Sequence, residues 1–220
     1  MDSVRRKQLA EKLLDGYVSG PTATTEATAR ARQKADVARA VVIVEGISDQ
    51  IALEALAIRL RRSLDEEGVV IFPVGGAHAA TRYLREFGPQ GDGKRVAGLY
   101  DVGEEAAIRW AVAQAGIGDP RTRPDLARLG FHVCVDDLED ELIRAVGPEH
   151  VEALIESQGD LSSFRSLQRQ PAWRDRDLTS QVRRFLGAGS RRKLRYARLF
   201  VESVDLDRVP RPLNAVLAEV

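Results

Sequence analysis

The chain has 220 residues, enough for one domain with a helical appendage or for two small domains, and we expect a single unit with a buried core. With 44% hydrophobic, 30% charged and 5% aromatic residues, it has the composition of a soluble globular protein, and its 33 basic and 33 acidic side chains give no net charge. The polar start of the chain predicts that there is no signal peptide and no membrane segment, so we expect a cytoplasmic protein.

The first elements predicted along the chain are helices followed by one buried strand. Residues 1–39 are expected to form one or two helices, interrupted at Gly20 and Pro21. The next segment, ARAVVIVEG (38–46), is a short β-branched run without alternation, which is typical of a strand buried on both faces of a parallel sheet. Apolar residues then recur at helical spacing over 48–64. These segments predict a first strand–turn–helix unit.

The same strand–turn–helix pattern recurs through the middle of the chain. Strands are predicted at 68–74, 94–101 and 130–135, and the helices that follow them at 77–88, 104–116 and 136–147. This alternation predicts an α/β fold, a parallel sheet of about four strands with helices on both faces. After residue 147 only helices are expected. We therefore divide the chain into an N-terminal helical segment (1–39), a sheet domain (40–147) and a C-terminal helical region (148–220).

Charge is distributed unevenly along this chain. Between Arg165 and Arg198 the sequence holds 11 basic residues against only Asp175 and Asp177, which predicts a phosphate-binding surface. The alternative is a solvated basic face without a ligand. In contrast, the run DDLEDE (136–141) supplies five carboxylates in six positions.

Three predicted strands end in carboxylates, at Glu45, at Asp101 and in the 136–141 run. The carboxyl ends of parallel strands share one edge of a sheet, so these acids are expected to converge there. Clustered carboxylates repel one another unless they hold a cation, and oxygen ligands favour Mg²⁺ or Mn²⁺. The single cysteine and three scattered histidines make no zinc pattern. The alternative is that each acid merely caps the helix that follows it.

The order and spacing of several segments resemble a known domain. The segments VVIVEGISDQIALEAL, PVGGAHAATRYL and AGLYDVGEE resemble the successive motifs of the Toprim domain. The later segments CVDDLEDELI and GSRRKLRYARLFVESV resemble those of its variant in the overcoming-lysogenization-defect (OLD) nucleases. The resemblance covers residues 38–215. It implies a Rossmann-like Toprim fold and a nuclease that cleaves DNA with Mg²⁺ or Mn²⁺, with two ions expected.

This resemblance also implies roles for individual residues. Glu45 corresponds to the Toprim glutamate, a metal ligand or general acid/base, and the expected metal ligands are Glu45, Asp49, Asp101, Glu105, Asp137 and Glu139. Gly103 stands where the second aspartate of the family's Asp-x-Asp motif is expected. Glu104 or Glu105 then substitutes for it, or the second metal binds weakly, or catalysis is impaired.

The predicted contacts to DNA come from a glycine turn and from the basic segment. The Gly75–Gly76 turn is expected to offer backbone N–H groups to a phosphate, although it is equally compatible with a plain tight turn. Lys193 matches the late lysine of the OLD nucleases and is expected to stabilise charge during catalysis. The remaining expected nucleic-acid contacts are Arg183, Arg184, Arg191, Arg192 and Arg195.

One further motif, GPQGDGKR (88–95), nearly matches a nucleotide-binding P-loop. It follows a predicted helix and precedes a strand, which is the reverse of the P-loop context, so we interpret it as a surface loop. An ATPase, if one takes part, is then expected as a separate subunit. Two alternatives to the nuclease stay open: a primase-like nucleotidyl transferase, and an impaired Toprim module that binds nucleic acid or a partner ATPase.

Overall fold

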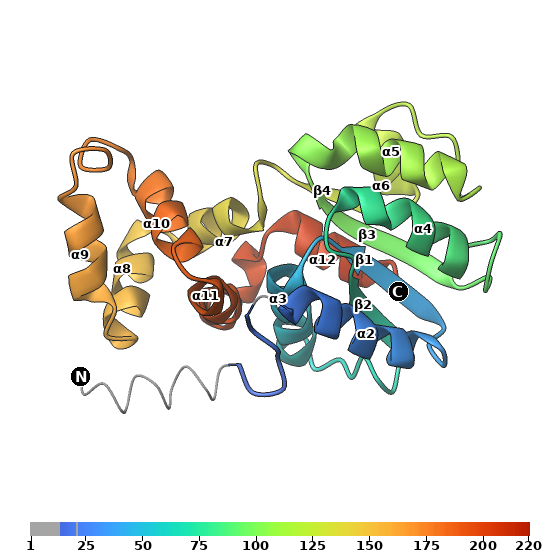
Figure 1. Cartoon of the computed structure of the whole chain (residues 1–220), viewed down its shortest axis with the longest axis horizontal. Coiled ribbons are helices and arrows are strands. Elements are labelled where there is room, and N and C mark those ends of the chain that lie inside the picture. Colours follow the sequence, from blue (N-terminus) through green and yellow to red (C-terminus); the bar gives the residue numbers. More distant parts are fainter. Residues whose placement is uncertain (1–13, 21) are drawn as a thin grey trace.

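A single parallel sheet forms the centre of the computed structural model, which describes residues 14–20 and 22–220. Its strands are β1 (Ala40–Val44), β2 (Val69–Pro73), β3 (Arg95–Asp101) and β4 (Phe131–Cys134). They lie in the order β2-β1-β3-β4, and every pair of neighbours is parallel (Figure 1). The predicted four-stranded parallel sheet is confirmed.

Helices cover both faces of the sheet, which explains why every residue of β1 and β2 is buried. Val42 and Val44 pack into one hydrophobic cluster, whereas Val41 and Ile43 pack into another on the opposite face. The first cluster includes residues of α3 (Ile47–Arg59), α11 (Ser190–Ser203) and α12 (Arg211–Ala218). The second includes residues of α2 (Ala23–Ala35), α4 (Ala77–Phe87), α5 (Glu105–Gln114) and α6 (Arg123–Arg128).

The C-terminal region is helical, as predicted. Helix α7 (Leu138–Val146) leads into this region. The helices of the region itself are α8 (Pro148–Ser157), α9 (Leu161–Gln168), α10 (Leu178–Gly187), α11 and α12. In Figure 1, α8, α9 and α10 lie at one end of the molecule, well away from the sheet. In contrast, α11 packs along α3, and α12 packs on β3 and β4. Because α11 and α12 share the core of one sheet face, the hydrophobic core continues across the boundary predicted at residue 147.

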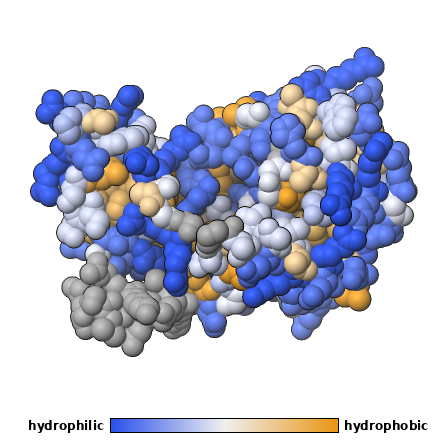
Figure 2. Space-filling model, viewed as in Figure 1, coloured by the Kyte–Doolittle hydropathy of each residue, from blue (hydrophilic) through white to orange (hydrophobic). Residues whose placement is uncertain are grey.

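The remaining features agree with a chain that folds around its own core. Figure 2 shows a largely hydrophilic face on which apolar side chains form small, separate patches. None of the described helices is long and apolar enough to cross a membrane. The 88–95 segment joins α4 to β3, in agreement with its interpretation as a loop. The part of the predicted N-terminal helical segment before residue 14 lies outside the described residues.

Candidate functional site

The carboxyl edge of the sheet brings together the two acids on which the sequence argument depends. Glu45 directly follows β1, and Asp101 is the last residue of β3. These two strands are hydrogen-bonded neighbours, with Ile43 beside Gly98 in the register. Asp49 lies in the first turn of α3, which begins two residues after Glu45. The short loops between strand and helix therefore keep all three carboxylates at one edge.

The acids at this edge lie close enough for their charges to act on one another. The pKa of Asp101 is raised to about 8, chiefly by desolvation and then by the charges of Asp49, Glu45, Asp137 and Glu104. Desolvation likewise raises the pKa of Asp49 to about 7, against a hydrogen bond from the Gly46 amide and with support from Glu139. Carboxylates from three strand ends thus share one electrostatic environment.

Glu139 and Lys193 form the inner polar pair of the site. The side chain of Glu139 is buried, and its Oε2 lies 3.2 Å from Nζ of Lys193. Its other oxygen, Oε1, is buried and finds no hydrogen-bond donor among the described residues. Burial raises the pKa of Glu139, although Lys193 opposes the rise. Burial also opposes the charge of Lys193, but Glu139 and Asp49 outweigh it and raise the lysine's pKa. Lys193 is therefore a protonated cation beside the acids.

The chemistry of this donor set fits a hard divalent cation. All the donors are carboxylate oxygens, several repel one another, and Oε1 of Glu139 lacks a partner. Yet over residues 14–20 and 22–220 no three His, Cys, Asp or Glu side chains lie close enough together to hold an ion. Metal binding therefore requires these acids to draw together, at a cost that the ion itself must offset.

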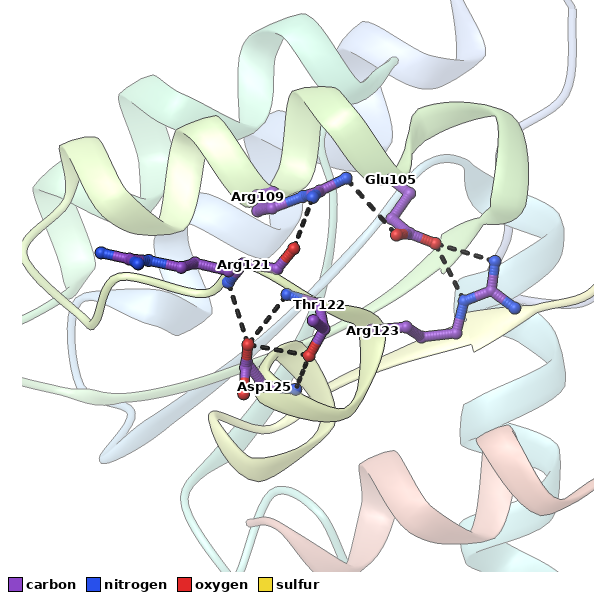
Figure 3. A network of polar contacts seen from close by, with 6 residues as sticks. All are labelled: Glu105, Arg109, Arg121, Thr122, Arg123 and Asp125. Atoms are coloured by element: carbon purple, nitrogen blue, oxygen red, sulfur yellow. Dashed lines mark hydrogen bonds and ion pairs between the residues drawn. The ribbon is translucent and has the colours of Figure 1, made fainter.

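Two of the expected ligands are engaged in other contacts. Asp137 caps α7 through a 2.8 Å hydrogen bond from the Asp140 amide, and its Oδ2 pairs with Arg183. The Glu105 carboxylate binds two arginines in a network that fixes the loop before α6 to the start of α5 (Figure 3). Its oxygens lie 3.5 Å from Nη2 of Arg109 and 2.8 Å from Nη2 of Arg123.

The structure distinguishes between the two glutamates proposed to substitute at Gly103. After desolvation, the charge of Glu104 contributes to the raised pKa of Asp101, and the charge of Glu105 contributes to the raised pKa of Tyr100. Gly103 itself lies in the short 3-10 helix η1 (Val102–Glu104), and a Cβ placed there would meet no atom within 4 Å from the described residues beyond its two chain neighbours. The site of the missing aspartate is therefore sterically open.

The first residue of the glycine turn after β2 is hydrogen-bonded to the sheet edge, so its amide is not available to a phosphate. Gly75 and Gly76 have φ angles of +80° and +117°, which a residue with a side chain adopts only with strain. The Gly75 amide donates a 2.9 Å hydrogen bond to the carbonyl of Glu45. Because this N–H is already used, the predicted phosphate contact at Gly75 is not supported, and its amide instead ties β2 to the Glu45 backbone.

The basic segment is less uniformly exposed than its sequence predicts. Arg195 is only 8% exposed, and its guanidinium pairs with the buried Asp160, which also accepts a hydrogen bond from the Tyr196 hydroxyl. This burial contradicts the predicted nucleic-acid contact at Arg195, which is a structural ion pair. Arg192 lies over the Phe185 ring at 4.1 Å and is half-buried.

Exposed arginines line a groove that the sequence analysis did not predict. Arg183 and Arg184 are exposed on α10 and belong to its walls, whereas Arg191 is exposed at the start of α11, outside this lining. A groove of about 630 Å³ lies between α10, the start of α11 and the loop before α10. Its walls include Asp137, Glu139, Trp173, Arg176, Arg183, Arg184 and Lys193. The interleaved residues Trp173, Arg174 and Arg176 were the signal that could have revealed it.

This parallel sheet, with acids at the carboxyl ends of neighbouring strands, defines a Toprim-type α/β protein. Residues 37–101 match the family described as "Overcoming lysogenization defect protein-like, TOPRIM domain". This segment of the chain is therefore similar to the OLD-like Toprim domain.

Solved structures show the same fold over most of the chain. The C-terminal region of the Xanthomonas campestris pv. campestris OLD protein is similar with a TM-score of 0.64 and 22% identity, over 85% of this chain and 94% of that one. The C-terminal region of the Burkholderia pseudomallei OLD protein is similar with a TM-score of 0.63 and 18% identity, over 83% and 96%. Comparison with curated proteins gives no match.

Proposed function

We propose that the chain is a nuclease module of the OLD Toprim type, which cleaves DNA phosphodiester bonds with Mg²⁺ or Mn²⁺. The observation that carries this proposal is the electrostatic coupling of Asp101 to acids from all three strand ends. A structural ion pair needs one acid and one base, whereas this edge gathers acids that raise each other's pKa. Such a cluster is stabilised by a divalent cation.

Each residue of the site has a role in this proposal. Glu45, Asp49, Asp101 and Glu139 would hold the metal, with Glu104 as a further acid beside Asp101. When bound, divalent ions generate a hydroxide nucleophile from water and offset the charge of the phosphate. Lys193 is placed beside the acids as a fixed, protonated cation that stabilises the charge developing on the phosphate.

A second candidate function is favoured by two specific observations. Gly103 replaces the second aspartate, and among the described residues no three ligands are assembled. Under this alternative the domain binds nucleic acid or a partner ATPase without cleaving DNA. A primase-like nucleotidyl transferase would need the same metal site. Its product, an extended strand, would distinguish it from a nuclease.

Cleavage of plasmid and single-stranded DNA in Mn²⁺ tests the nuclease proposal directly. The double variant Glu45→Gln, Asp101→Asn should lose cleavage while it still folds, because it removes two ligands without changing side-chain size. The matched control is Glu66→Gln, Asp119→Asn, which removes the same charge from exposed positions elsewhere. Equal cleavage by the site variant and the control would overturn the site. Metal-dependent DNA binding without cleavage would favour the second candidate, and joining of nucleotides instead of hydrolysis would favour the transferase.

A further inference from the structure

We propose that the groove beside Lys193 binds an unpaired nucleotide of a single strand, with its base against Trp173. The inference deepens the proposed function, since it takes nucleic acid as the ligand and names the form that the site accepts. The groove volume of about 630 Å³ lies within the range of sites that enclose small molecules, roughly 300–1,000 Å³. A concave site of this size encloses a nucleotide, not a duplex.

The lining of the groove has the two components that a single strand requires. Four cations line it, namely Arg176, Arg183, Arg184 and Lys193, against the two carboxylates Asp137 and Glu139, which pair with Arg183 and Lys193. The cations suit a phosphodiester backbone, and the aromatic face of Trp173 suits a base. In a duplex both faces of each base are stacked, so only an unpaired or extruded base can reach such a ring.

A buried glutamine holds the wall of the groove in place. Gln181 is 6% exposed, and its Nε2 donates hydrogen bonds of 2.9 Å to the carbonyls of both Trp173 and Arg176. Its Oε1 accepts a 2.8 Å hydrogen bond from Gln168. Buried polar groups of this kind specify one loop conformation, because each lost partner leaves an unsatisfied atom. The tryptophan and the arginine are therefore preorganised for a ligand.

The present neighbour of the tryptophan ring can give way to a base. The guanidinium of Arg184 lies over Trp173 at 5.8 Å from the ring centroid. Both ends of this contact are accessible, since Arg184 is exposed and Trp173 only partly buried. Exposed cation–π contacts are weak. A base that stacks on the ring would displace Arg184, whose charge is then available to the adjoining phosphate.

The position of the groove connects it to the proposed chemistry. Glu139 and Lys193 belong both to the groove lining and to the acidic site at the sheet edge. A nucleotide held by Trp173 thus lies beside the residues that we propose to act on its phosphodiester bond. Strand-separated DNA is the substrate class that this arrangement favours.

Tryptophan fluorescence offers a test that does not depend on cleavage. The chain has two tryptophans, and Trp110 is 59% exposed on α5, away from the groove. Trp110→Phe leaves Trp173 as the only reporter. In EDTA, a thymidine single strand should quench its emission saturably, whereas a hairpin duplex or an abasic strand of equal length should quench it little. If thymidine and abasic strands quench the Trp173 emission equally, the proposal is wrong. This test requires no substitution among the residues that line the groove.

A matched pair of variants measures the contribution of stacking. Trp173→Ala should weaken single-strand binding about tenfold, as the loss of one stacked base typically does, and leave abasic-strand binding unchanged. Trp110→Ala is the control and should bind like the parent chain. If Trp173→Ala cleaves DNA in Mn²⁺ as efficiently as the parent, the groove proposal is wrong and the nuclease proposal stands. If binding depends on Trp173 but no cleavage occurs, the groove proposal stands and the nuclease proposal is wrong.

Discussion

Replacement of Asp101 by asparagine should stabilise the metal-free protein, and by more at pH 8 than at pH 5. The folded-state pKa of Asp101 is raised from 3.8 to about 8, chiefly by desolvation and then by the neighbouring acids. Between these values the folded chain binds more protons than the unfolded chain, so stability falls as the pH rises. Asparagine has no charge to bury and escapes this loss.

The magnitude follows from the pH interval between the two measurements. Between the unfolded and folded pKa values, each pH unit changes the free energy of unfolding by at most about 1.4 kcal/mol. The three units between pH 5 and pH 8 therefore give an upper limit of about 4 kcal/mol. Solvent reaches part of the Asp101 side chain, and screening reduces the effect to about 2 kcal/mol. Asp49, whose pKa is raised to about 7, lowers the stability of the parent and the variant alike as the pH rises, so its contribution cancels in this comparison.

Urea unfolding in EDTA at both pH values measures the difference in the free energy of unfolding between the parent and Asp101→Asn. The exposed Asp119→Asn is the matched control and should show no pH-dependent gain. Added Mn²⁺ should stabilise the parent at pH 8 by ligand linkage and the Asp101 variant much less. A variant no more stable than the parent at pH 8 would refute the electrostatic reasoning behind the site.

Four further substitutions test other parts of the structure. Gly103→Asp, at a position where a Cβ meets no atom within 4 Å, should tighten Mn²⁺ binding about tenfold by calorimetry, because it adds a carboxylate ligand. Lys193→Ala should slow cleavage about a hundredfold with little change in DNA affinity, and normal cleavage at saturation would make it a docking residue. Arg195→Met leaves a buried carboxylate without its counter-ion and should cost about 3–5 kcal/mol of stability by denaturation, and unchanged stability would show that the pair is dispensable. Charge reversal at Arg184 and Arg191 should weaken DNA binding and flatten its salt dependence, and unchanged slopes would mean a merely solvated surface.

Local patterns were sufficient to predict the sheet and the residues at its edge. Strands buried on both faces have continuous β-branched runs, so β1 and β2 were identifiable without tertiary information. The residue that ends such a run must lie at the carboxyl edge, which placed Glu45 and Asp101 correctly. These predictions succeeded because they depend only on strand direction and on the short loops that follow.

The errors arose where a contact joins residues far apart in the sequence. Arg195 was counted as a surface charge, yet its partner Asp160 lies 35 residues earlier and draws it into the core. The groove depends on Gln181, whose hydrogen bonds shape a loop that has no regular pattern of its own. Glu104 and Glu105 are adjacent in sequence, yet Glu105 pairs with Arg109 and Arg123 whereas the charge of Glu104 acts on Asp101, a difference that depends on the tertiary fold.

The same long-range pairing changes what the basic segment means. Arg183 pairs with Asp137, and Lys193 pairs with Glu139, so part of the positive charge near α10 already balances the acidic sheet edge. In the proposed function, a divalent ion held by Glu139 would compete with Lys193 for the oxygens of that carboxylate. The ammonium group of Lys193, once displaced by the ion, would then face the nucleotide groove. Since coupling between two ligands is reciprocal, metal that strengthens nucleic-acid binding must itself be bound more tightly when nucleic acid is present.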